Sequence, residues 1–286
     1  MSQEINNQNQ ENPKVFDTLH TRKEGAVLFV EIAVPPMNLL NPELVRDLVS
    51  LIQQAEADAS IKVLVFKSAD PDYFISHVDI TRIKEYRDYT TKLTGEPSLG
   101  LLFRYMSASR LVNIAQIEGR ARGAGSEFVL ACDMSFAAQQ AAIFSQPEVG
   151  FGLIPGAGGI QHLARQLGRA RALEVMLSAK DYDADLAERY GWINRALPAN
   201  VIGDFVRLLA HRIARFPSTA LVAVKNRVNA ITLAPAEDFG RDSNLFGEAA
   251  QTHETQSRIQ TAMTRGFQTR EVEMNLSRLV GELGDK

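Results

Sequence analysis

The sequence predicts an α/β fold followed by a helical C-terminal region. Short apolar or β-branched runs, such as residues 61–66 and 113–117, have the composition of buried strands and alternate with segments of helical periodicity. From residue 201 onward the pattern is entirely helical. We therefore expect a mobile, Asn/Gln-rich tail over residues 1–14, a core over 15–200 and a helical region over 201–286.

Composition excludes several classes of protein. Hydrophobic residues make up 45% of the 286, enough for a large core, and a formal net charge of −3 argues against a broad basic surface for nucleic acid. The single cysteine, Cys132, excludes an intramolecular disulfide. No apolar run approaches a membrane span, and the start lacks a basic segment followed by an apolar one. We expect a cytoplasmic protein that binds neither nucleic acid nor membrane.

The first predicted elements are a hairpin, a loop and a helix. Residues 15–22 and 26–33 are alternating or apolar on either side of a glycine turn, which predicts two paired strands. Two prolines within residues 34–41 remove backbone donors, so this segment is expected to be a loop. Pro42 favours the start of a helix that runs to about residue 58.

Helices and strands alternate through the middle of the chain. We expect a strand over residues 61–66, and later a strand over 113–117. Between them the pattern predicts a helix over 81–89, a polar loop over 90–98 and a helix over 99–111. Further helices are predicted over residues 160–167 and 170–178, and a short helix followed by a strand over 183–194.

A glycine cluster with two glutamates nearby is the main chemical signal. Gly123-Ala124-Gly125 separates a predicted strand from a predicted helix, an order that leaves N–H groups free to hold negative charge. Glu127 lies in the first turn of that helix, and Glu148 precedes a second glycine-rich turn. Alone, Glu127 is better explained as complementing the helix dipole, and a solvated loop carboxylate is an alternative for Glu148. Together they suggest acid/base chemistry on a substrate that develops charge on oxygen.

The ordered string around these residues resembles the crotonase, or enoyl-CoA hydratase/isomerase, superfamily. Residues 117–127, with the sequence IEGRARGAGSE, match the family's I-N-G-x-A-x-G-G-G-x-E. Cys132-Asp133 matches the C-D pair that closes the next helix, and residues 145–159 match x-Q-P-E-x-x-x-G-x-x-P-G-x-G-G. The resemblance spans most of the chain. It implies a spiral of ββα units with a C-terminal helical trimerisation region, in a homotrimer or a dimer of trimers.

By this resemblance the protein hydrates a 2-enoyl-CoA to a 3-hydroxyacyl-CoA. The N–H groups of Val78 and Ala124 match the family's oxyanion hole, Glu127 matches the base that orients water, and Glu148 the proton donor to the α carbon. Coenzyme A is part of the substrate, so we expect no separate cofactor, and no metal-ligand spacing is present. The substrate-binding residues that the resemblance implies are Pro36, Ser76, His77, Val78, Asp79, Ile80 and Gly123.

One departure from the family lies beside the oxyanion position. The family's F-x-A-G-x-D-[LI] becomes FISHVDI over residues 74–80, so Ser76 and His77 replace Ala and Gly. Glycine often takes positive φ there, which His adopts at a cost. We favour a surface histidine on an altered loop; the alternative is that His77 reaches the cleft as a base or as a donor to the thioester.

A second departure lies near the C-terminus, where residues 270–273 replace the usual K-R-x-P. The basic residues that meet the CoA phosphates are therefore not defined. Lys225, Arg265 and Arg270 are candidates, although each is more often a solvated charge.

Other functions stay open at this point. The Ser76-His77 loop is compatible with a hydrolase of a CoA thioester or of a β-diketone, and the fold could also serve as a non-catalytic acyl-CoA binding subunit. A Rossmann dinucleotide protein is a weaker alternative, because the Gly-Ala-Gly turn lacks a third glycine at the right spacing.

Overall fold

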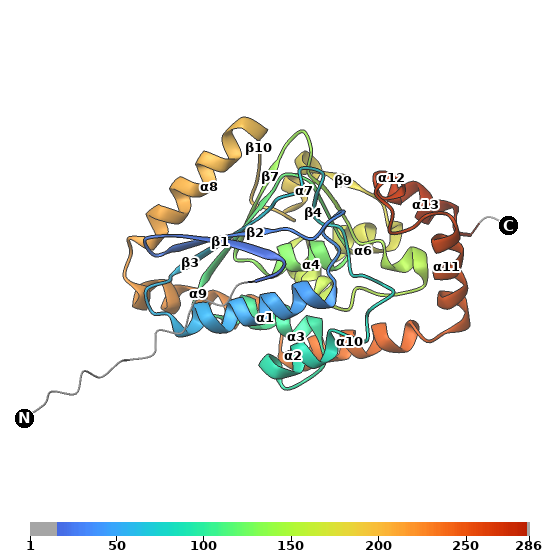
Figure 1. The fold of residues 1–286 in the computed structure, drawn as a ribbon, viewed down its shortest axis with the longest axis horizontal. Coiled ribbons are helices and arrows are strands. Elements are labelled where there is room, and N and C mark those ends of the chain that lie inside the picture. Colours follow the sequence, from blue (N-terminus) through green and yellow to red (C-terminus); the bar gives the residue numbers. More distant parts are fainter. Residues whose placement is uncertain (1–15, 285–286) are drawn as a thin grey trace, which may run out of the picture.

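The computed structural model describes residues 16–284 (Figure 1), so the predicted tail over residues 1–14 lies outside it. Two sheets form the centre of the molecule. The larger has the order β1-β2-β3-β5-β7-β10. Its strands are β1 (Leu19–Glu24), β2 (Val27–Ile32), β3 (Val63–Ser68), β5 (Val112–Ile117), β7 (Met134–Ala138) and β10 (Arg195–Leu197). Only the β1–β2 pair is antiparallel, which confirms the predicted hairpin.

The smaller sheet has the order β4-β6-β8-β9. Its strands are β4 (Tyr73–Ile75), β6 (Arg120–Arg122), β8 (Ile143–Ser145) and β9 (Tyr182–Asp183). β4, β6 and β8 run parallel, so their carboxyl ends meet at one edge. Ligands of parallel sheets bind beyond such an edge.

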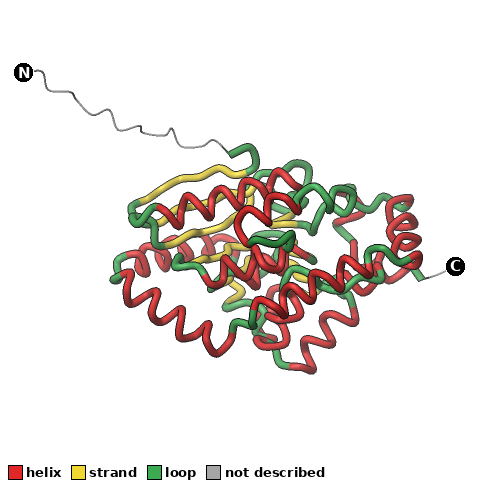
Figure 2. The backbone as a smooth tube through the Cα atoms, turned by 90° about the horizontal axis from the view of Figure 1, so that it is seen from below, coloured by secondary structure: helices red, strands yellow, loops and turns green. Residues whose placement is uncertain are grey.

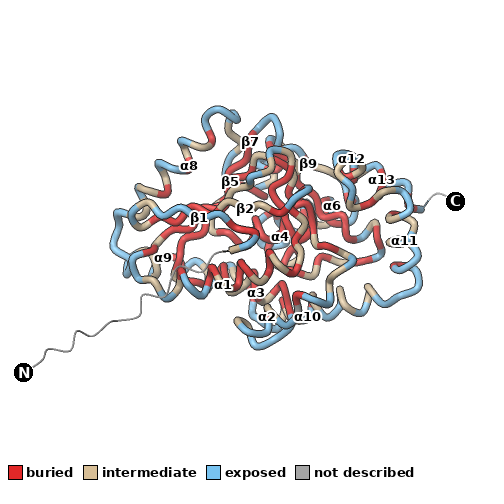
Figure 3. The backbone as a smooth tube through the Cα atoms, viewed as in Figure 1, coloured by how far each residue is buried: buried red, intermediate tan, exposed pale blue. Residues whose placement is uncertain are grey.

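Successive side chains along the strands of the larger sheet point to opposite faces, and each face packs into a different core. Val27 and Phe29 of β2 pack with α8 (Ala199–Ala214), while Leu28 and Val30 face the main core on the opposite side. Figure 1 shows α8 on one side of this sheet and α1 (Pro42–Ala57) on the other. Buried residues concentrate in the strands and in α4 (Ala124–Ala131), whereas much of α8 is exposed (Figure 3).

Several predicted helices are present with small shifts at their ends. In α1, Pro42 is the first residue and the Asn41 side chain accepts a 2.8 Å hydrogen bond from Leu44 N, a favourable cap. The other helices between the strands are α3 (Leu99–Ala108), α5 (Gly159–Gln166), α6 (Arg169–Ser178) and α7 (Ala184–Tyr190).

The prediction of a helix over residues 81–89 is wrong. The helix is α2 (Arg87–Thr94), and it occupies part of the predicted loop over 90–98. The Asp79 carboxylate accepts hydrogen bonds from both N and Oγ1 of Thr81, which gives the backbone a local alternative to a helix. Residues 81–86 consequently form turns.

The C-terminal region is helical, as predicted. Its elements are α8, α9 (Ser218–Thr232), α10 (Ala236–Ala249), α11 (His253–Thr264), α12 (Arg270–Glu273) and α13 (Leu276–Glu282). The last three pack as a small core with the segment after β8, through Phe151, Leu153 and Leu276 among others. Figure 2 shows this end of the molecule built of helices and loops. No helix within residues 16–284 is long and apolar enough to span a membrane.

Candidate active site

A cavity of about 860 Å³ lies beyond the carboxyl edge of the smaller sheet. Each parallel strand of that sheet leads into its wall: Val78 follows β4, Ala124 follows β6 and Glu148 follows β8. The volume is within the usual range for small-molecule sites. Apolar side chains from the helical C-terminal region form much of the remaining wall, including Phe246, Ile259, Phe267 and Leu276.

The glycine turn presents a free amide at the start of α4. Gly123 caps this helix with φ 49° and ψ −125°, a conformation that favours glycine. A Cβ on Gly125 would lie 2.0 Å from Ile75 O, so only glycine lets α4 pack directly on β4. Ala124 N has no backbone acceptor among the described residues, as expected for a first helical residue. Its φ is not positive, so alanine keeps the donor where the family has glycine.

Val78 supplies a second free amide. Leu40 N donates to His77 O at 2.8 Å, and Asp79 N donates to Leu40 O at 3.1 Å. This parallel bridge uses the groups on either side of the Val78 N–H and leaves that N–H without an acceptor within residues 16–284. Two residues with uncommitted amides therefore line the cavity, and an oxyanion hole needs two such donors.

Glu127 is a buried carboxyl held by two backbone amides. Ala157 N and Gly159 N each donate to Glu127 Oε1 at 2.8 Å. A Cβ on Gly159 would lie 3.0 Å from the same oxygen, so the second glycine turn fits closely around it. Burial raises the pKa of Glu127 to about 7 despite these hydrogen bonds. The side chain is therefore poised between base and acid at neutral pH.

Glu148 is a second buried carboxyl at the same cavity. It begins the 3₁₀ turn η1 (Glu148–Phe151). A Cβ on Gly123 would lie 2.9 Å from Glu148 Oε1, while Oε2 is buried without a partner in the described part of the chain. Burial, and then the charge of Glu127, raise the pKa of Glu148 well above its ordinary value. The raised pKa favours the protonated form of Glu148, which can donate a proton.

The favoured prediction of a surface His77 is wrong. Its side chain is 7% exposed, and its φ is not positive. Nε2 lies 2.9 Å from Glu273 Oε1, Nδ1 lies 2.8 Å from Val78 O, and the ring stacks on Phe267 with centroids 4.8 Å apart. The cover comes from a segment almost two hundred residues later, which no local pattern at His77 indicates.

The other predicted substrate-binding residues divide into two groups. Ile80 and Gly123 line the cavity together with His77 and Val78. Pro36, Ser76 and Asp79 are not among its lining residues. The Ser76 hydroxyl is fully buried and donates to Met37 O.

The three basic candidates are all engaged within the chain. Lys225 is buried, and its Nζ donates to Leu111 O at 2.6 Å and to Asp133 Oδ2 at 2.8 Å. Arg265 donates to Glu282 O at 3.0 Å, and Arg270 forms ion pairs with Asp70 and Asp72. None of the three lines the cavity.

Glu273 is the polar residue near the site that motif reasoning missed. Its side chain is fully buried against His77. The available signal was the departure of residues 270–273 from the family pattern, which coincides with the departure at His77. In residues 16–284, no group of three or more His, Cys, Asp and Glu side chains is placed to hold a metal ion.

Comparison with known proteins places this geometry in context. The profile of the family described as enoyl-CoA hydratase/isomerase matches residues 22–270. The short-chain-enoyl-CoA hydratase of Clostridium acetobutylicum is 31% identical over 257 residues, covering 88% of this chain and 95% of the relative. The 2,3-dehydroadipyl-CoA hydratase of Escherichia coli K12 is 29% identical over 235 residues, covering 82% and 90%.

Solved structures agree on the fold. A crystal structure of a proposed enoyl-CoA hydratase from Streptomyces avermitilis superposes with a TM-score of 0.92 at 46% identity. The match covers 95% of this chain and 99% of that one. The predicted α/β spiral is confirmed by this likeness, whereas trimer formation stays a prediction.

Proposed function

Because this chain belongs to the enoyl-CoA hydratase/isomerase family, whose members act on CoA thioesters, we propose that it hydrates a 2-enoyl-CoA to a 3-hydroxyacyl-CoA. The observation that carries the proposal is the meeting of two buried glutamates and two free amides at one cavity. A non-catalytic protein that only binds acyl-CoA has no need for a pair of carboxyls whose pKa values are both raised.

In the proposed reaction the thioester oxygen accepts hydrogen bonds from Val78 N and Ala124 N. These donors withdraw electrons from the conjugated double bond and stabilise the enolate that forms when water adds to the β carbon. Loss of one such donor typically costs about two to three orders of magnitude in rate.

The two glutamates supply the proton transfers. Glu127, with a pKa of about 7, accepts a proton from water as its oxygen bonds to the β carbon. Glu148, whose raised pKa favours the protonated form, donates its proton to the α carbon. The product gains one water molecule in total. Proton exchange with solvent then returns both carboxyls to their starting states.

The hydrolase alternative gains no support from the positions of its residues. The Ser76 hydroxyl is buried and donates to a backbone carbonyl, so it is not a free nucleophile. Both ring nitrogens of His77 lie within hydrogen-bonding distance of protein oxygens, so His77 is not a free base.

The test is hydration of crotonyl-CoA, followed by the loss of enoyl absorbance. We expect Glu127→Gln and Glu148→Gln each to lower kcat by roughly a thousandfold, since general acid/base catalysis contributes about 10² to 10⁴. Glu237→Gln, at an exposed position on α10, is the matched control and should retain wild-type kcat. Undiminished turnover in either active-site variant would overturn the two-glutamate mechanism. Binding of CoA esters without turnover in the wild type would favour the non-catalytic alternative.

A further inference from the structure

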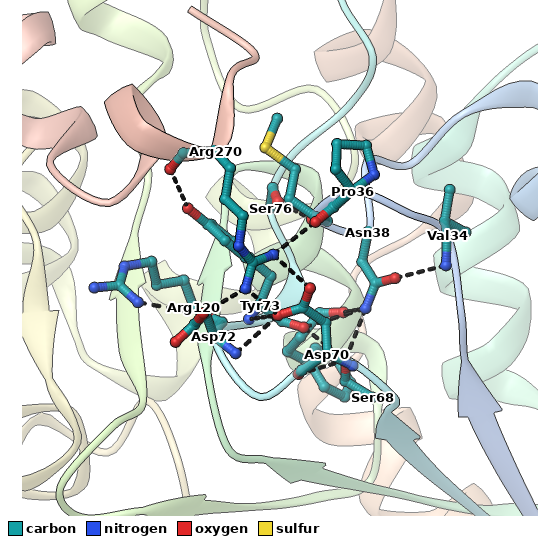
Figure 4. Close-up of polar contacts among 12 residues, drawn as sticks. Val34, Pro36, Asn38, Ser68, Asp70, Asp72, Tyr73, Ser76, Arg120 and Arg270 are labelled. Carbon is teal, nitrogen blue, oxygen red and sulfur yellow. Dashed lines mark hydrogen bonds and ion pairs between the residues drawn. The ribbon is translucent and has the colours of Figure 1, made fainter.

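The segment of residues 267–273, here called the C-terminal strap, lies against the loop that carries the Val78 amide. The middle of the strap is fastened through Arg270. Its guanidinium pairs with Asp70 and Asp72 and donates to Pro36 O at 2.6 Å (Figure 4). Tyr73 Oη donates to Arg270 O at 3.0 Å. The strap is thus tied to the start of β4, a few residues before Val78.

A second set of contacts joins the strap to residues 77–80. Gln268 Oε1 accepts from Ile80 N at 2.9 Å, and Gln268 Nε2 donates to Asp79 Oδ1 at 3.0 Å. Glu273 Oε1 accepts from Gln268 N at 3.1 Å and lies 2.9 Å from His77 Nε2. Glu273 therefore joins the strap's own backbone to His77.

The geometry at His77 favours a charged ring. Nδ1 faces the carbonyl of Val78, which can only accept, so Nδ1 carries hydrogen. Nε2 faces the carboxyl group of Glu273, and an ionised carboxylate there favours a second hydrogen on Nε2. Burial alone would lower the pKa of His77, but the charge and hydrogen bond of Glu273 outweigh it and raise this pKa. Burial alone would raise the pKa of Glu273, but His77 and the other partners of Glu273 outweigh it and lower this pKa.

Few other charges face this pair. Arg122 of β6 opposes protonation of His77, but its Nε and Nη2 both donate to Asp181, at 2.8 and 2.6 Å. Its Nη1 donates to Glu273 O at 2.6 Å. Glu148 is also nearby, since a Cβ on Gly123 would lie 2.9 Å from Glu148 Oε1 and 3.4 Å from His77 Cβ.

The charged ring of His77 also helps to hold Val78, the residue that supplies the amide. Leu40 N holds the carbonyl before Val78, and His77 Nδ1–H holds the carbonyl of Val78 itself. The Val78 N–H is the group between them that stays uncommitted. The Val78 N–H shares its peptide plane with the His77 carbonyl, so the hydrogen bond from Leu40 N sets the direction of this N–H. The hydrogen bond from His77 Nδ1 holds the following peptide plane, and it thereby limits rotation about the backbone bonds of Val78.

Stability alone does not account for such a pair. A buried ion pair seldom stabilises a fold more than apolar side chains of the same volume do, because both charges lose their hydration. Here the pair joins two segments that are separated by almost two hundred residues. One of its partners, His77, directly precedes Val78, the candidate donor of the oxyanion hole. Both partners also stand at the two places where the chain departs from its family pattern.

We propose that His77 and Glu273 are positioning residues, which through a buried imidazolium–carboxylate pair let the C-terminal strap fix the Val78 N–H toward the substrate carbonyl. The inference rests on the proposed function, because it names what sets the geometry of that oxyanion hole. A hydrogen bond that tightens as charge develops affects kcat more than substrate binding.

The first test is the kinetics of Glu273→Gln, which keeps the shape of residue 273 and removes its charge. We expect kcat for crotonyl-CoA hydration to fall about tenfold while KM stays within twofold, since the donor is loosened rather than removed. Glu271→Gln is the matched control, because Glu271 is an exposed residue of the same helix. His77→Gly should lower kcat similarly, and the double variant should be no slower than His77→Gly, because the two residues act through one bond.

The second test does not depend on turnover. Amide hydrogen exchange over residues 76–80 of the substrate-free protein should be faster in Glu273→Gln than in wild type, and unchanged in Glu271→Gln. Unchanged exchange and unchanged kcat in Glu273→Gln would overturn the proposal, as would equal changes in both variants. If the wild type does not hydrate enoyl-CoA, the proposed function fails while the exchange comparison still decides whether the pair fixes this loop.

Discussion

Two groups of buried acids lie near Gly123, and their pKa values are shifted in opposite directions. At Glu127 and Glu148 no cation is paired with either carboxyl in the described chain, and burial raises both pKa values. At Glu273, a histidine ring meets the carboxyl and the pKa is lowered. Burial is similar in the two places, so the presence of a cationic partner decides whether the acid holds its proton.

This difference separates a reactive acid from a structural one. An acid that keeps its proton near neutral pH can exchange it with a substrate. An acid locked to a cation exchanges nothing, but its direction is fixed. The molecule therefore combines two carboxyls whose pKa values are raised without a cationic partner and one carboxylate whose direction is fixed by such a partner.

The largest expected effect comes from removing a cation at the paired site. Arg122→Met should lower the free energy of unfolding by about 3 kcal/mol, since it leaves Asp181 and the Glu273 carbonyl without their buried donor. Urea unfolding measures this change. Arg278→Met, at a side chain that is 80% exposed, should change stability by less than about 0.5 kcal/mol. A loss below about 1 kcal/mol for Arg122→Met would show that the paired site does not depend on this cation.

At the unpaired site, removal of the acid should stabilise the fold. The folded pKa of Glu127 is about 7, above the ordinary 4.5, so the folded state holds a proton that the unfolded chain has lost between these values. Stability therefore falls as pH rises through this window. Glu127→Gln should be more stable than wild type by about 2 kcal/mol at pH 8 and equal to it near pH 5. Thermal unfolding at the two pH values measures this, and a gain that is the same at both would contradict the account.

A smaller effect is expected on activity. For the wild type, kcat/KM should fall about tenfold between pH 8 and pH 6, because protonation of Glu127 with a pKa of about 7 removes the base. Glu127→Gln should show no such decline in its residual activity. A wild-type profile that is flat through pH 7 would place the base elsewhere.

The sequence could predict the unpaired site because its signals are local. Both glycine turns lie between residues 113 and 159, with Glu127 just after the first turn and Glu148 shortly before the second. A free amide at a helix start follows from backbone geometry alone. Both glutamates and Ala124 line the cavity as expected, whereas Val78, which also lines it, was indicated only by the family resemblance.

The paired site could not be predicted in the same way. His77 and Glu273 are separated by 196 residues, so their contact depends on how the C-terminal helices return to the sheet. The failed helix over residues 81–89 has a partly similar cause, because Asp79 Oδ1 accepts both locally from Thr81 and from Gln268 of the strap. Helical periodicity contains no information about such side-chain hydrogen bonds.

The cavity wall has one further consequence. The two glutamates and two amides of the proposed reaction stand after three parallel strands, whereas Phe246 and Ile259 belong to the separate helices α10 and α11. Residue size on those helices can change the length and width of the chamber without shifting the acids. For the proposed function, we therefore expect substitutions on α10 and α11 to alter which acyl groups fit while both glutamates keep their positions.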